Sequence, residues 1–429
     1  MKDIFLSQTL DTIAQSIKLK KFSSYELVSY YCNTIKEVNP LINAVIRFDE
    51  DKALAKASAA DKLLAEGHIL GPLHGIPFTA KDWLETKEFI STAGMEERRN
   101  YLPKEDATVI TRLQNAGAIL LGKTNVPYNG TSATENPIFG TTNNPYNLKY
   151  SPGWSSGGEA AIISAGGTAF GVGSDSGGSI RTPCHFCGIA GLKASTGRIP
   201  ATGHFPEIGG FMDPRSQIGP LARYVKDLAY LFPIIAGGNG KDPYVVETPY
   251  FLTPSLSSLN LAYYVNHHNI TPIQDIAKIT QECAEFVKKD VKTISLNEPK
   301  ALSSVMDLTN TYWNIYKGSV GTKEYLELTK KWDQFRKEMW IYMQPYDAII
   351  TPVATSTAHP HKDTPAENIV YTLTYSLLGW PCVVVRVGTS EQGLPINIQV
   401  VAKPFHEEIC LLIASRLEKM CGWQEPKIK

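Results

Sequence analysis

The stretch AFGVGSDSGGSIR, at residues 169–181, decides how the chain folds. Its first five residues are apolar or glycine, and they predict a buried strand that leads into a loop of serines and glycines. The preceding segment, Glu159 to Ala165, is small and apolar and predicts a helix packed closely behind a second serine-glycine turn at residues 155–158. Short buried strands that alternate with helices are typical of an α/β fold, in which helices cover both faces of a sheet.

This alternation extends from residue 71 to 240, and different patterns flank it. Residues 1–70 predict helices, with Ser23 or Ser24 as an N-cap and Glu26 placed for a capping box. Residues 241–340 predict helices rich in aromatic side chains, which we expect to pack into the core or, alternatively, to cover the substrate. Residues 341–429 predict strands at 347–351, 382–387 and 396–401 and a closing helix at 407–419.

Charge and hydropathy narrow the class of protein. The chain has 429 residues, and 42 Lys and Arg balance 42 Asp and Glu, so the net charge is zero. This balance gives no electrostatic reason to expect nucleic acid or an anionic membrane as a partner. The first residues do not form a signal peptide, and no run of about 18 apolar residues occurs. We therefore expect a soluble, cytoplasmic protein without a transmembrane segment.

The seven cysteines do not indicate a disulfide framework, because their number is odd and the chain is long. Cys184 and Cys187 form a C-x-x-C pair. A zinc site would need a second pair at a suitable spacing, and the sequence has none. We expect buried structural thiols and no metal site.

The loop around Ser179 could hold an anion. The glycines at 177 and 178 allow backbone N–H groups to point into one concavity, which can hold a phosphate or the oxyanion of a reacting carbonyl. The phosphate-loop pattern Gly-x4-Gly-Lys-Ser/Thr is absent, and the Gly-x-Ser-x-Gly elbow is not met around Ser179. Neither nucleotide binding nor an α/β-hydrolase is supported.

A nucleophilic serine would need a base. His74, His185 and His204 lie near glycine segments, but none stands in a recognisable triad context. Lys81 has apolar neighbours, and burial would lower its pKa enough for it to act as a base. Alternatively, Lys81 is a surface lysine paired with Asp82.

Together these segments resemble the amidase signature family. Its glycine-serine block is similar to SPGWSSGGEAA at 151–161, GVGSDSGGSIRTP at 171–183 and FCGIAGLK at 186–193. Its lysine block is similar to GPLHGIPFTAKD at 71–82, and GKTN at 122–125, QIGPLAR at 217–223 and GLPINIQ at 393–399 also match. The likeness covers nearly the whole chain except residues 241–340.

The resemblance implies one large domain over residues 1–429, with a central mixed β-sheet covered by helices on both faces. Within it we expect four parts: N-terminal helices (1–70), a catalytic core (71–240), a variable helical insert that covers the substrate (241–340), and C-terminal strands and a helix that complete the core (341–429).

The resemblance also implies roles for individual residues. Ser179 matches the nucleophile, Lys81 matches the base, and Ser155 matches a bridging serine that follows a cis peptide bond in this family. Backbone groups of Ser176, Gly177 and Gly178, with Ser179 itself, match the oxyanion donors. These roles imply amide hydrolysis through an acyl-enzyme, with no metal or organic cofactor.

Three features depart from the family pattern or match it loosely. Trp154 stands where glycine is usual, and its indole either lines the substrate channel or only packs beside the turn. Ser174 and Ser176 stand where threonine is common, which keeps the hydroxyl. Asn129 and Gly130 match a stretch that contributes to the acyl pocket in relatives, although this chain is one residue shorter there.

The expected function is hydrolysis of a small-molecule carboxylic acid amide. The alternative is the glutaminase component of a tRNA-dependent glutamyl/aspartyl amidotransferase, its A subunit, which releases ammonia from glutamine. GRIPATGH at 197–204 is more similar to the hydrolase branches, and the N-terminal helices look complete without partner subunits. A silent binding protein is disfavoured because all three triad positions are filled, and a homodimer stays open.

Overall fold

One mixed sheet organises the protein. The computed structural model describes residues 2–128, 133–210, 213–249, 253–316, 318, 321–365 and 367–428. Within them, eleven strands pair in the order β1-β3-β2-β6-β8-β7-β12-β13-β11-β9-β10. The strands are β1 (Val45–Phe48), β2 (Pro77–Lys81), β3 (Ile119–Thr124), β6 (Phe170–Asp175), β7 (Ala190–Lys193), β8 (Gln217–Ala222), β9 (Asn260–Tyr263), β10 (Thr293–Leu296), β11 (Ala348–Pro352), β12 (Cys382–Thr389) and β13 (Pro395–Ala402), with β4 (Glu135–Asn136) and β5 (Gly140–Thr141) as a separate pair.

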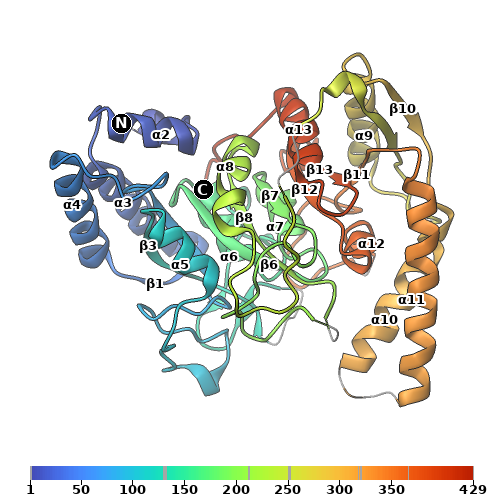
Figure 1. Cartoon of the computed structure of the whole chain (residues 1–429), viewed down its shortest axis with the longest axis horizontal. Coiled ribbons are helices and arrows are strands. Elements are labelled where there is room, and N and C mark those ends of the chain that lie inside the picture. Colours follow the sequence, from blue (N-terminus) through green and yellow to red (C-terminus); the bar gives the residue numbers. More distant parts are fainter. Residues whose placement is uncertain are drawn as a thin grey trace.

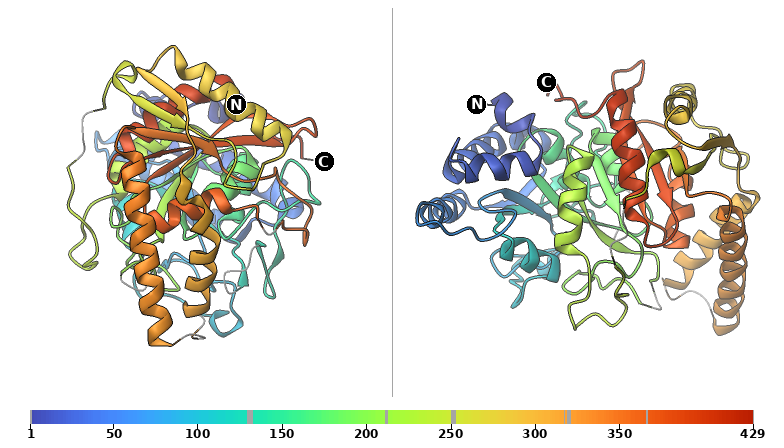
Figure 2. Two further views of the ribbon diagram at one scale, coloured as in Figure 1. Left: turned by 90° about the vertical axis from the view of Figure 1, so that its right-hand side faces the viewer. Right: turned by 45° about the horizontal axis from the view of Figure 1, so that its top comes forward.

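Helices cover both faces of this sheet, as the sequence predicted. They are α1 (Lys2–Leu6), α2 (Leu10–Lys18), α3 (Ser24–Ile42), α4 (Glu50–Ala65), α5 (Thr108–Asn115), α6 (Gly157–Ser164), α7 (Arg181–Cys187), α8 (Val225–Ile235), α9 (Gln274–Lys288), α10 (Val305–Tyr316), α11 (Thr322–Met343), α12 (Val370–Leu378) and α13 (Glu407–Leu417). Helices α8 and α13 lie in front of the strands in the right-hand view of Figure 2. Helices α2 to α4 lie at one end of the molecule, and α10 and α11 project at the other (Figure 1).

The N-terminal helices begin as the sequence indicates. Helix α3 is capped by Ser23, whose hydroxyl accepts from the Glu26 N–H at 3.0 Å while the Glu26 carboxylate accepts from the Ser23 N–H at 2.8 Å. This confirms the predicted capping box. Residues 1–70 also contain strand β1, which was not predicted, because four residues are too few to show an alternating pattern.

Two other segments differ from the sequence prediction. Residues 241–340, expected to be helical, also contribute β9 and β10, which extend the sheet edge in parallel from β11. Helix α12 was missed in a segment expected to hold only strands and a last helix. All nine of its residues are buried, so it lacks the polar stripe that reveals a surface helix.

The residues of interest lie where central strands end. Strands β2 and β6 are parallel neighbours, and β8 pairs antiparallel to β6 with Asp175 opposite Gln217. Every residue of β2 and β6 is buried. The carboxyl ends of β2 and β6 therefore place Lys81, Ser174 and Asp175 at one buried edge of the sheet. Among the helices of the described residues, none is long and apolar enough to cross a membrane.

Candidate active site

Lys81 ends β2 and meets two serines from different segments. Its Nζ lies 2.6 Å from the Ser155 Oγ, 2.9 Å from the Ser174 Oγ and 3.3 Å from the Ser174 carbonyl oxygen. The Lys81 side chain is fully buried and that of Ser155 nearly so. The sequence analysis singled out both Lys81 and Ser155, which are 74 positions apart, and the structure brings them together.

The alternative surface pair between Lys81 and Asp82 does not form. Asp82 is itself buried and pairs instead with Lys123 at 3.4 Å, and it accepts a hydrogen bond from the Thr92 hydroxyl at 2.6 Å. Within the described ranges, no carboxylate forms an ion pair with Lys81.

Burial sets the protonation of Lys81. It lowers the pKa of Lys81 well below the ordinary value for lysine, while the nearby carboxylates of Asp175 and Glu159 act to raise it. Glu159 contacts the hydroxyls of Thr79 and Thr124, and burial raises its pKa to about 7. The Trp83 ring covers the amine, with its centroid 4.1 Å from the Lys81 Nζ. The ring and the two carboxylates favour the charged form, but burial outweighs them and shifts the equilibrium toward the neutral amine.

Ser179 lies beside the serine turn but is not hydrogen-bonded to Ser155. The Ser179 carbonyl oxygen accepts from the Ser156 N–H at 3.2 Å, which ties the two loops together. Over the part of the chain that the structure describes, the Ser179 hydroxyl makes no hydrogen bond, and the residue is 8% exposed. Its hydroxyl is therefore free to approach a ligand.

The peptide bond before Ser155 is not cis. The cis peptide bond of the described residues joins Phe205 to Pro206. The expectation drawn from the family resemblance is therefore not met at Ser155, whose hydroxyl reaches Lys81 with the bond in the far more common trans form.

The glycine loop that ends at Ser179 has a fixed shape. Gly178 has φ +130°, a conformation that favours glycine, and a Cβ there would lie 2.5 Å from the Thr372 hydroxyl oxygen. The Gly178 N–H donates to the Asp175 carboxylate at 2.7 Å. This contact differs from the oxyanion role predicted for Gly178, because its N–H already has an acceptor.

Three neighbouring N–H groups remain available. In the described parts of the chain, the backbone N–H groups of Ser176, Gly177 and Ser179 donate to no acceptor. Gly177 and Ser179 are buried, and buried N–H groups without partners are rare in folded proteins. The loop can therefore offer donors to an oxyanion from three of the four predicted positions.

A buried ion pair holds this loop in place. The Asp175 carboxylate pairs with the Arg181 guanidinium at 2.9 Å, and both side chains are fully buried. Burial acts to raise the pKa of Asp175, but Arg181 outweighs it and the pKa falls to about 2. Arg181 also donates to the Thr372 carbonyl at 2.9 Å and to the Ser376 hydroxyl at 2.7 Å, which anchors the pair to α12.

His204 reaches the same cluster, which the sequence did not reveal. Its Nε2 lies 2.7 Å from the Ser174 Oγ and its Nδ1 lies 2.6 Å from the Pro206 carbonyl oxygen. His74 contacts the Ala60 carbonyl instead, and His185 accepts from the Asn397 N–H at 2.9 Å. His204 ends the motif at 197–204, but that motif does not show which side chain the ring contacts, so the sequence did not distinguish His204 from the other two histidines.

The predicted substrate-binding residues are placed only in part. The Trp154 side chain is half-buried and lies beside the glycine loop. A Cβ at Gly177 would be 3.8 Å from the Trp154 Cζ3, an ordinary contact distance. It packs against the buried aromatic cluster formed by α10, α11 and α12. The Ser176 hydroxyl contacts the Ser216 hydroxyl. Asn129 and Gly130 lie outside the described residues.

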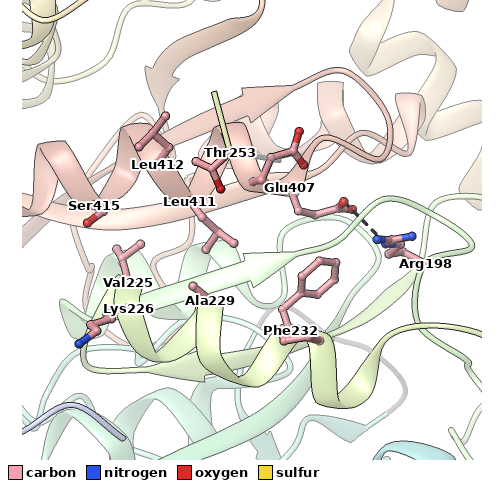
Figure 3. A pocket seen from close by; sticks show the side chains of 12 residues that line it. Arg198, Val225, Lys226, Ala229, Phe232, Thr253, Glu407, Leu411, Leu412 and Ser415 are labelled. Carbon is pink, nitrogen blue, oxygen red and sulfur yellow. Dashed lines mark ion pairs between the residues drawn. The ribbon is translucent and has the colours of Figure 1, made fainter. Parts of the chain in front are cut away.

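A separate pocket of about 410 Å³ lies between α8 and α13 (Figure 3). Its apolar wall includes Phe232 and Leu411, and at one end Arg198 pairs with Glu407 at 3.9 Å. The described lining of this pocket contains none of Lys81, Ser155 and Ser179.

The cysteines are free thiols. Six of the seven are buried, and Cys421 is half-buried. Within the described residues, no group of three or more His, Cys, Asp or Glu side chains is arranged to hold a metal ion.

Comparisons with known proteins agree with this architecture. A family model described as Amidase matches residues 26–327 and 313–411. The A subunit of the glutamyl-tRNA(Gln) amidotransferase of Marinomonas sp. (strain MWYL1) is 30% identical, over 97% of each chain. The human fatty-acid amide hydrolase 2 is also 30% identical, over 96% of this chain and 88% of its own. The structure of 6-aminohexanoate cyclic dimer hydrolase with its substrate superposes with a TM-score of 0.85 at 24% identity, over 99% of each chain.

Proposed function

This chain belongs to the amidase family, and we propose that it hydrolyses a carboxylic acid amide through an acyl-enzyme formed on Ser179. One observation carries the proposal: a fully buried lysine, with no ion-pair partner in the described chain, lies 2.6 Å from a serine hydroxyl beside a glycine loop. Members of this family act on amide C–N bonds, so the coarse activity follows from membership and the residue roles are our proposal.

We assign the proton route as follows. Ser179 Oγ bonds to the amide carbonyl carbon, its proton passes to Ser155, and Ser155 gives its own proton to neutral Lys81. The reverse transfer protonates the leaving nitrogen, and the C–N bond breaks. Water activated by the same relay then cleaves the acyl-enzyme ester and releases the carboxylate. Every proposed step uses only these side chains and water.

The oxyanion is held by backbone groups in this proposal. The N–H groups of Ser176, Gly177 and Ser179 support it, because they are available and adjacent to the nucleophile. Loss of one such donor typically lowers the rate about 100- to 1000-fold. Gly178 contributes by shaping the loop, since its own N–H is bonded to Asp175.

We propose an apolar or aromatic acyl group for the substrate. Trp154 supports this choice, because its ring lies beside the oxyanion loop and continues into the aromatic cluster of α10, α11 and α12. Asn129 and Gly130 are proposed to complete the acyl pocket. We further propose a cytoplasmic enzyme that acts alone or as a homodimer.

A fluorophosphonate probe tests the proposal without knowledge of the substrate. Such probes react with activated serines, so we expect one covalent adduct, located by mass spectrometry on the peptide that contains Ser179. Hydrolysis of fatty, aryl and amino-acid amides would then define the acyl group. Folded protein that neither reacts with the probe nor hydrolyses any of these amides would refute the mechanism and favour a binding protein.

The labelling rate of Ser179 should fall as the pH is lowered, because Lys81 accepts a proton only when it is neutral. Since burial lowers the pKa of Lys81, the rate should rise with pH through a pKa well below that of an exposed lysine and then stay constant. Rates of labelling across a pH series measure this acid limb, the part of the profile in which the rate rises with pH. The variant Lys81→Met should lose both the rate and the limb, and a limb that persists in Lys81→Met would belong to another group.

The glutaminase component of an amidotransferase is a second candidate. The 30% identity to such a protein, over 97% of each chain, favours it. It predicts that the protein copurifies with partner subunits and releases ammonia from glutamine in their presence. Hydrolysis of a fatty or aryl amide by the isolated chain, without glutamine turnover, would exclude this candidate.

A further inference from the structure

The hydroxyl of Ser174 is held between Lys81 and His204. The Ser174 Oγ lies 2.9 Å from the Lys81 Nζ on one side and 2.7 Å from the His204 Nε2 on the other. All three side chains are at least 96% buried, with exposures of 2%, 0% and 4% in the order Ser174, Lys81, His204. The direction of each hydrogen bond among these three side chains therefore depends on their partners inside the protein and not on solvent.

The His204 ring can accept only from Ser174. Its Nδ1 faces the Pro206 carbonyl oxygen at 2.6 Å, and a carbonyl only accepts, so Nδ1 carries the hydrogen. Burial lowers the pKa of His204 to about 3, so the ring is neutral. The Nε2 of a neutral ring with Nδ1–H is an acceptor. The Ser174 hydroxyl must therefore donate its hydrogen to His204.

This arrangement fixes the orientation of the Lys81 amine. A neutral amine has two N–H donors and one lone pair. The Ser174 carbonyl oxygen has no hydrogen to give, and the Ser174 hydroxyl has given its hydrogen to His204. Both of these oxygens can only accept from Lys81. Of the three contacts of the amine, Ser155 alone is left to donate to the lone pair.

We propose that His204 is a positioning residue, which orients the Ser174 hydroxyl so that the lone pair of Lys81 faces the Ser155 hydroxyl. The inference rests on the proposed function, because it concerns the base of that proton relay. Without the histidine acceptor, the Ser174 hydroxyl can turn and donate to Lys81, which would occupy the lone pair that Ser155 needs.

The variant His204→Phe tests this role. It keeps an aromatic ring beside Trp83, whose centroid lies 5.9 Å from that of His204, but it removes the acceptor. We expect the second-order rate of Ser179 labelling by an alkyl fluorophosphonate to fall about ten- to a hundredfold. The matched control is His74→Phe, which removes a buried histidine bonded to Ala60 and Leu70, and it should label at the wild-type rate.

The pH profile separates positioning from packing. A Ser174 hydroxyl that donates to the neutral amine stabilises that form, so the acid limb should move to lower pH in His204→Phe. Asp175 on β6 and Glu159 on α6, the carboxylates that act on Lys81, are unchanged in this variant. A merely loosened site would admit water and move the limb to higher pH.

Ser174→Ala completes a double-mutant cycle. This variant lacks the Ser174 hydroxyl, so it loses one acceptor for the Lys81 N–H but has no hydroxyl that could donate to the lone pair. It should therefore lower the labelling rate less than His204→Phe does. Adding His204→Phe to Ser174→Ala should then change the rate by less than about twofold. The variant His204→Gln, whose amide can accept from Ser174 and donate to Pro206, should retain most of the rate and the wild-type limb.

Three results would overturn the inference: an unchanged rate in His204→Phe, an equal loss in both Ser174 backgrounds, or an acid limb moved to higher pH. Failure of the proposed function gives a different result, in which wild-type Ser179 itself is not labelled.

Discussion

Replacement of Ser179 by alanine should abolish amide hydrolysis while the fold is retained. Removal of a nucleophilic serine lowers kcat by about a millionfold in a protease with a comparable acyl-enzyme mechanism, and we expect a loss of at least about ten-thousandfold here. The fold should be unaffected, because the Ser179 hydroxyl makes no hydrogen bond to the described residues. The measurement is the initial rate of hydrolysis of the best amide from the substrate panel, with thermal unfolding as the check on the fold.

Ser164→Ala is the matched control for this prediction. Ser164 is fully buried in α6, and its hydroxyl donates to the Cys187 carbonyl at 2.7 Å, so its removal should cost some stability but leave kcat unchanged. Residual hydrolysis by Ser179→Ala within about tenfold of the wild type would place the nucleophile elsewhere, because loss of a nucleophile costs far more than that.

The second large effect is on stability. Arg181→Met should lower the free energy of unfolding by about 3–5 kcal/mol, because it leaves the buried Asp175 carboxylate without its partner. It also removes the donors to Thr372 and Ser376, and with them the link between the glycine loop and α12. Denaturant unfolding of the wild type and the variant at neutral pH measures the difference.

The pH dependence of this effect has a defined sign. In the wild type the pKa of Asp175 is depressed to about 2, so the stability contributed by the pair is present above the ordinary pKa of 3.8 and is lost as the pH falls toward 2. In Arg181→Met, burial instead raises the pKa of Asp175, and protonation relieves the uncompensated charge. The difference between the two proteins should therefore shrink as the solution is acidified.

The double variant Asp175→Asn/Arg181→Met serves as the control. It removes both charges, so it should recover part of the lost stability. A single variant Arg181→Met that unfolds within about 1 kcal/mol of the wild type would show that the carboxylate is solvated or otherwise compensated.

The sequence predicted the parts of the site that rest on local motifs. Lys81 and Ser155 could be paired in advance because each stands in a long, specific motif, and the strand before Ser174 could be recognised from its apolar residues. His204 could not, because its contact depends on how the loop after β7 folds over the ends of β2 and β6. The partner of the Gly178 N–H could not be predicted either, because from the sequence it could donate to an oxyanion or to Asp175, and only the structure shows that it donates to Asp175.

The same limit applies to the fold. The capping box is a local pattern: it was predicted with Glu26 and with either Ser23 or Ser24 as the N-cap, and the structure has Ser23. The sheet with helices on both faces followed from alternating elements. Helix α12 is buried on every side, so its sequence lacks the polar stripe that marks a helix at a surface. That helix nevertheless supplies the carbonyl and hydroxyl groups that hold Arg181.

Adjacent residues of β6 serve two different purposes. Side chains alternate along a strand, so Ser174 faces Lys81 and His204 while Asp175 faces Arg181 and α12. The pairing of Ser174 with Ile218 and of Asp175 with Gln217 on β8 fixes this choice. A slip of one residue in that register would turn the carboxylate toward the lysine, where a salt bridge would keep the amine protonated. The alignment of two strands thus decides whether Lys81 is a base or only a counter-ion.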